Sequence, residues 1–227
     1  MFGEFIIQDS NRRWKKHDFS RGVCGMIFEG LILGMIIGKL RGGKIEQLGK
    51  FMFRSSFLLV FALILQIGTS ILISIDNKIA VNNRTILYII SYIMLFIVLF
   101  LNLGRKSVWF IFIGAFANFI ALVLNGGSMP IDVALLEKMG FENMFQSFKA
   151  GAMPNYIDIN NAYSFTSYLG KKFVTPAIYP LKQIFSIGDM FISLGILIFI
   201  QGIMQTNRSR YSPGTIKFDY KDGRMRL

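Results

Sequence analysis

Cysteine, histidine and charged residues are scarce in this chain of 227 residues. One Cys and one His cannot form an internal disulfide, a cysteine metal site or the common histidine-based catalytic and zinc sites. Only 17% of the residues are charged, against about 25% in a soluble domain. With 53% hydrophobic residues, this composition excludes a disordered chain, a disulfide scaffold, a nucleic-acid-binding module and most soluble enzymes. We therefore expect an integral membrane protein.

Long apolar stretches are the clearest feature that the sequence does contain. A helix needs roughly 20 apolar residues to cross a hydrocarbon core of about 30 Å, and four stretches reach that length, while a fifth is shorter and richer in glycine. Backbone amides cannot stay unpaired in lipid, which favours helices over loops. We predict an all-α membrane protein, a bundle of about five spanning helices with a partly helical outer loop. The expected spans lie near residues 26–40, 55–75, 85–103, 108–124 and 187–206.

The basic residues indicate how these spans are oriented. The net charge is +12, and five Lys or Arg crowd the link after the first span, while six lie in the tail 207–227. Cytoplasmic segments hold the excess of Lys and Arg. This distribution predicts a protein of the cell membrane with a cytoplasmic C-terminus and an extracytoplasmic loop 125–186. We expect the basic tail to be attracted to anionic lipid headgroups.

Residues 1–25 do not fit this topology, because their five basic residues would lie outside. Two explanations are open: the first span is absent or re-entrant, or translation starts naturally at Met26. Codons for Arg21-Gly22 can form a ribosome-binding sequence at a suitable distance before Met26, which favours the second. A start at Met26 would remove His17 and Cys24, and it would place Glu29 in the first helical turn, where a carboxylate is tolerated.

Several small and polar residues in the spans are candidates for packing or binding. Glycines 30, 34 and 38 recur every four residues, a spacing that lets another helix approach closely. We expect Gly30, Gly34 and Gly38 to pack against a helix of the same chain, with homodimerisation as the alternative. Gln66 and Asn118 lie inside spans and are expected to bond to neighbouring helices, with a solute site as the alternative.

Glycines and a proline follow the fourth span. Asn125-Gly126-Gly127 permits positive φ, and Pro130 can then occupy the first turn of an amphipathic helix over 131–139 that lies in the membrane interface. A glycine-rich phosphate cradle is the alternative, but the Lys-Ser or Lys-Thr of a P-loop is missing. The outer loop is also rich in aromatic residues, which suggests structured pieces that rest on the membrane or cap the bundle, or a lid over an outward-facing cavity.

The last span opens with Ser186-Ile187-Gly188-Asp189. Ser followed three residues later by an acid has capping-box spacing, so Ser186 is expected to cap the helix and Asp189 to favour its positive end. An intramembrane aspartyl protease with Gly-x-Gly-Asp is the sharper alternative. Ser186 replaces its first glycine, and no second Asp lies in a predicted span to share the proton. Binding of a ligand or ion at Asp189 is a third possibility.

Three motifs together resemble a family of uncharacterised bacterial multi-pass membrane proteins, defined only as a domain of unknown function. They are Glu29 to Gly34 followed by Leu40-Arg41-Gly42-Gly43, Asn125 to Pro130, and Phe185 to Asp189. The resemblance implies a multi-pass fold and no assigned activity. Gly170-Lys171-Lys172 departs from the Leu-Gly-Asp expected in the long loop, so a loop carboxylate is absent there.

The leading hypothesis is a non-enzymatic structural, accessory or partner-binding membrane protein. The alternative is a small carrier that binds a solute or lipid between its helices, with Gln66, Asn118, Asn125 and Asp189 as the polar groups. A membrane enzyme is a third hypothesis. We expect no catalytic residue, cofactor or metal site. The expected partners are the lipid bilayer and a membrane protein or second copy of the chain, and nucleic acid is not expected.

Overall fold

The computed structural model describes residues 19–51, 54–175 and 182–205, with side chains from Gly25 onward. The predicted tail 207–227, most of the leader 1–25, and Pro176 and Pro180 of the outer loop lie outside the described residues.

Five long helices form the body of the protein: α2 (Phe19–Leu40), α4 (Ser56–Ser74), α6 (Arg84–Leu101), α7 (Lys106–Leu124) and α10 (Ile187–Met204). Of these, α4, α6, α7 and α10 are long and apolar enough to cross a membrane, and they coincide with four of the five predicted spans. The predicted fold class, an all-α membrane protein, is thereby confirmed. The fifth predicted span is also helical, but α2 begins at Phe19, seven residues before Met26.

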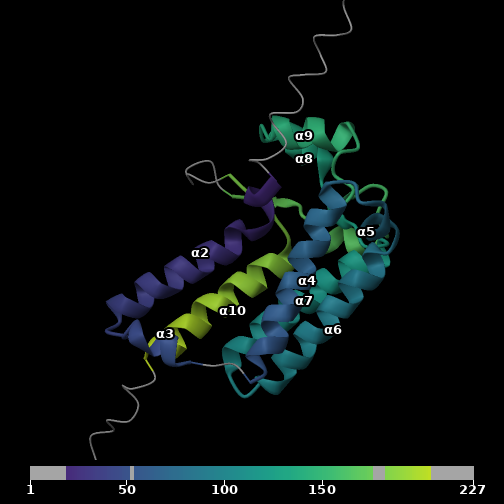
Figure 1. The fold of residues 1–227 in the computed structure, drawn as a ribbon. Coiled ribbons are helices and arrows are strands. Elements are labelled where there is room, and N and C mark those ends of the chain that lie inside the picture. Colours follow the sequence, from purple (N-terminus) through teal and green to yellow (C-terminus); the bar gives the residue numbers. More distant parts are fainter. Residues whose placement is uncertain (1–18, 52–53, 176–181, 206–227) are drawn as a thin grey trace, which may run out of the picture.

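The long helices form a row rather than a closed ring. α10 lies beside α2 (Figure 1) and also packs against α7, and α6 contacts both α7 and α4. Aromatic side chains fill the α6–α7 contact, where the ring of Tyr92 lies 5.3 Å from Phe119 and that of Phe96 lies 5.5 Å from Phe112. Large apolar side chains such as Phe57 and Phe100 remain 84% and 70% exposed. Lipid would cover such an outer surface.

Glycines set the close approaches in this row. A Cβ added to Gly114 of α7 would lie 2.5 Å from the carbonyl oxygen of Gly188 in α10. On the other side of α10, Cβ atoms added to Gly30 and Gly38 would lie 2.5 Å from Ser193 Oγ and 2.6 Å from Met204 Sδ, and Gly34 faces the same helix. The glycine face of α2, which a second copy would need, is therefore covered by the chain's own α10.

The described residues of the segment 125–185, namely 125–175 and 182–185, are folded, and we call them the outer cap. It contains α8 (Val133–Lys138), α9 (Glu142–Lys149) and a 3-10 helix, η1 (Thr166–Tyr168). β1 (Met129–Ile131) pairs in parallel with β2 (Tyr156–Asp158), and β3 (Phe173–Val174) pairs antiparallel with β4 (Ile184–Phe185). Its small core consists of Ile131, Leu136, Phe145 and Ile184. Two further short helices join the long ones, α3 (Glu46–Lys50) and α5 (Lys78–Asn82).

The prediction for Pro130 was wrong. Pro130 lies in β1, not in the first turn of a helix, because residues 129–131 pair with β2. The helix begins three residues later at Val133, and its N-cap residue Asp132 accepts a side-chain hydrogen bond from the Leu135 amide at 2.9 Å. α8 lies with α9 beyond the ends of the long helices (Figure 1), and its Leu136 is buried in the cap core. The placement of this helix in the membrane interface stays a prediction.

Glu29 also differs from its expected place. α2 begins ten residues before it, so Glu29 does not lie in a first turn. Its carboxylate is half-buried and accepts a hydrogen bond from the side-chain amide of Gln183 in the outer cap. The side chain of Gln183, rather than the helix N-terminus, therefore binds this carboxylate.

Candidate functional site

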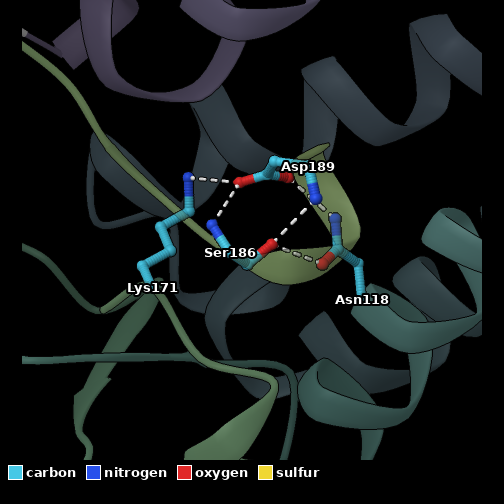
Figure 2. Close-up of polar contacts among 4 residues, drawn as sticks. All are labelled: Asn118, Lys171, Ser186 and Asp189. Atoms are coloured by element: carbon cyan, nitrogen blue, oxygen red, sulfur yellow. Dashed lines mark hydrogen bonds and ion pairs between the residues drawn. The ribbon is translucent and has the colours of Figure 1, made fainter. Parts of the chain in front are cut away.

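An ion pair lies where the outer cap meets the long helices. Lys171 Nζ is 3.4 Å from Asp189 Oδ2, and the two side chains are only 7% and 17% exposed. Asp189 stands in the first turn of α10 and forms a capping box with Ser186. Ser186 Oγ accepts a hydrogen bond from the Asp189 amide at 3.0 Å, and Asp189 Oδ2 accepts one from the Ser186 amide at 3.1 Å (Figure 2).

Asn118 of α7 completes this cluster. Its Nδ2 donates to Asp189 Oδ1 at 2.8 Å, and its Oδ1 accepts from Ser186 Oγ at 2.8 Å (Figure 2). Gly188 leaves room for Asn118, because a Cβ at position 188 would lie 2.2 Å from Asn118 Oδ1 and clash with it. Both carboxylate oxygens of Asp189 are thus occupied by donors, which compensates for the removal of the charge from water.

Backbone hydrogen bonds bring Lys171 to this place. Its amide donates to Pro130 O at 2.8 Å, and its carbonyl accepts from the Asp132 amide at 3.0 Å, so residue 171 lies along the edge of β1. Sequence reasoning noted a missing carboxylate at this part of the loop and missed the role of the lysine. The available signal was Asp189 itself, since an acid at the start of an apolar helix requires a partner.

The other predicted polar residues lie elsewhere. Asn125 ends α7, where its Nδ2 donates to Ala121 O at 2.6 Å and to Thr166 Oγ1 at 2.8 Å, and its Oδ1 accepts from the Tyr163 amide at 3.0 Å. Gln66 lies in α4, beside the side chain of Tyr92 in α6. Of the four candidate ligand residues, only Asn118 and Asp189 come together.

A second junction, centred on Asn155, was also missed by the sequence analysis. This buried cap residue accepts a hydrogen bond from the Tyr88 hydroxyl at 3.3 Å and donates to Ser70 O at 3.3 Å and Ser74 Oγ at 3.4 Å. Beside it, Arg84 Nε donates to Gly126 O at 2.7 Å, and its Nη1 donates to Pro154 O at 2.9 Å. The cap is therefore attached to α4 and α6 as well.

The polar groups where the outer cap meets the long helices connect these two parts of the chain. Through Asn125, which bonds to Ala121 of α7, and through Asn155, Lys171 and Gln183, the outer cap contacts all five long helices. Within the part of the chain that the structure describes, no group of three His, Cys, Asp or Glu residues could hold a metal ion. The chemistry of the arrangement is charge neutralisation and hydrogen bonding.

Comparison with protein families agrees with the resemblance noted in the sequence. The model of a family of unknown function, DUF5317, matches residues 50–201. The chain belongs to this family. The match extends from α4 through the outer cap and most of α10, so it includes Asn118, Lys171 and Asp189, whereas α2 precedes it. No curated protein and no solved structure matches the chain, and the family carries no assigned activity.

Proposed function

We propose that this protein is a non-enzymatic integral membrane protein that presents its outer cap to a membrane-protein partner. One observation carries the proposal: the buried polar side chains at the cap boundary are used to attach the cap to the helices. A shared solute site would need Asn125 and Gln66 beside Asn118 and Asp189, but Asn125 is bonded to Thr166 and Gln66 lies beside Tyr92.

Firm attachment matters for binding. A surface that is already ordered loses less conformational entropy when a partner binds, so more of the contact energy appears as affinity. The attachments come from opposite ends of the row of helices, with Gln183 bonded to α2 and Asn155 bonded to α4. Exposed aromatic side chains on the cap, with Tyr163 68% and Tyr168 67% exposed, supply the residue type enriched at interfaces.

We also propose an orientation in the membrane, with the cap on the extracytoplasmic side and the C-terminus in the cytoplasm. At the end of the helices away from the cap, the described residues carry seven exposed cations against one acid, Glu46. Cytoplasmic segments are enriched in Lys and Arg. In a Cys24→Ser background, K138C on the cap should react with a membrane-impermeant maleimide added to intact cells, and K44C should react only after permeabilisation.

Site-specific photocrosslinking tests the partner. A photoreactive residue at Tyr168 of the cap should give one adduct of defined mass in native membranes. The same residue at Ile64, an equally exposed position on α4, is the matched control and should crosslink only to lipid. Absence of a protein adduct from Tyr168, Tyr163 and Lys138 alike would contradict the proposal.

The alternative function is a carrier that binds a solute or lipid between its helices. It is favoured by one observation, that Lys171 and Asp189 place both signs of charge beside Asn118 in a buried setting. A zwitterionic solute that competes for this pair should stabilise the purified protein against heat. That stabilisation should disappear in Asp189→Asn and persist in Gln66→Ala, which lies outside the cluster.

A further inference from the structure

Three exposed cations gather at the end of the helices opposite the outer cap. Arg54 precedes α4, and Arg105 and Lys106 lie at the start of α7. We call these three residues the basic corner. The Asn102 side chain at the end of α6 holds it together, because its Oδ1 accepts from the Arg54 amide and its Nδ2 donates to the Arg54 carbonyl, both at 3.1 Å. The Arg105 amide donates to the Asn102 carbonyl at 3.3 Å.

Aromatic rings fix the position of one of the cations. The guanidinium carbon of Arg105 lies 4.6 Å from the centre of the Phe51 ring and 5.9 Å from that of Phe199. Such cation–π contacts orient the guanidinium group without neutralising its charge. Arg105 remains exposed, so its outer donors are available to an anion.

The surroundings of the basic corner favour an anion. The described residues of this end also include exposed Lys39, Arg41, Lys44 and Lys50, and the single acid is Glu46 in α3. An excess of one sign over a surface attracts ligands of the opposite sign, most strongly at low ionic strength.

Exposed apolar side chains lie next to the cations on two helices. Phe57 follows Arg54 by three residues and is 84% exposed, and Trp109 follows Lys106 by three residues and is 49% exposed. Within α7, residues three apart occupy one face, so Trp109 lies one turn deeper than Lys106. The corner therefore presents positive charge at the end of the helices and apolar surface below it, which is the order of groups in a phospholipid.

We propose that the basic corner binds the phosphate group of an anionic phospholipid, whose acyl chains pack along Phe57 and Trp109. Arg54, Arg105 and Lys106 supply three charges and several N–H donors to one phosphate, and Arg in particular can donate two parallel hydrogen bonds. A free phosphate would use only the cations. The exposed aromatic side chains below them single out the lipid.

Binding of phosphatidylglycerol to the detergent-purified protein, measured by native mass spectrometry, tests this site. The variant R54Q/R105Q/K106Q should bind the lipid at least tenfold more weakly than the wild type. The control K78Q/K138Q/K182Q removes the same charge from exposed positions at the cap end and should stay within twofold. Equal losses in both variants would mean that net charge alone attracts the lipid, and no loss in either would also overturn the site.

Further arms separate the lipid from other anions and from misfolding. Glycerol phosphate should not compete with phosphatidylglycerol at equal concentration, and phosphatidylcholine should bind far more weakly. Equal competition by glycerol phosphate would replace the lipid by a soluble anion. R54Q/K106Q leaves Arg105 on its rings, so this variant should melt like the wild type and still lose several-fold in affinity. F57A/W109A should also weaken lipid binding, and unchanged binding would refute the acyl-chain contact.

Discussion

Replacing Lys171 by Met should release the outer cap from α10. Removing one partner of a buried ion pair costs about 3–5 kcal/mol because the remaining charge is uncompensated. Here the Asp189 carboxylate keeps donors from Asn118 at 2.8 Å and from the Ser186 amide at 3.1 Å. We therefore expect a loss of about 3 kcal/mol, the lower end of that range.

A double-mutant cycle separates the pair from its surroundings. Asp189→Asn should cost about as much as Lys171→Met, and the double variant should cost clearly less than their sum, by about 2 kcal/mol. Reversible unfolding in mixed micelles, titrated with a denaturing detergent, gives the four free energies of unfolding. Lys138→Met, an exposed lysine of the same cap, is the control and should change stability by less than about 0.5 kcal/mol.

Two results would refute this reasoning. If the single losses simply add, Lys171 and Asp189 do not stabilise each other. If Lys171→Met costs no more than Lys138→Met, the buried pair does not attach the cap.

Three further changes test the packing and the other junctions. Gly114→Ala should lower the free energy of unfolding by about 3 kcal/mol, because its Cβ would lie 2.5 Å from a carbonyl oxygen of α10. Gly68→Ala is the control, since nothing lies within 4 Å of its Cβ, and it should leave the free energy of unfolding in micelles unchanged or higher by up to about 1 kcal/mol. Asn155→Ala should cost about 2 kcal/mol and speed proteolysis of the cap, and wild-type cleavage rates would contradict its attachment role. Asn125→Ala should cost about 1–2 kcal/mol by releasing Thr166, and its melting temperature measures this.

The long helices could be predicted because each apolar stretch carries its own signal. α4, α6, α7 and α10 follow from length and hydropathy alone, which are local properties. The beginning of α2 at Phe19 could not be predicted in this way, because the residues before Met26 form a mixed, basic segment without an apolar run. The start of α2 therefore gives no helical signal in the sequence.

In the candidate site, too, the local features could be predicted and the contacts between distant segments could not. Ser186 and Asp189 of the capping box lie three positions apart, so the motif can be recognised in the sequence. Lys171 reaches Asp189 only because β1 holds it, through hydrogen bonds between segments about 40 residues apart. Pro130 was misplaced for the same reason, since its strand forms by pairing with β2, 27 residues later. Pairing between distant short segments leaves no periodicity to detect.

The row of helices has a consequence for how the protein is made. α2 packs mainly on α10, the last long helix of the described residues, and Asp189 in that same helix binds the cap. A nascent chain that ends before residue 187 therefore contains α4, α6 and α7, while α2 lacks α10 and Lys171 lacks the Asp189 carboxylate. Synthesis of α10 completes both halves of the structure in one step. A chain truncated before α10 should accordingly be recognised by membrane quality control, since it exposes the glycines of α2 and leaves Lys171 without Asp189.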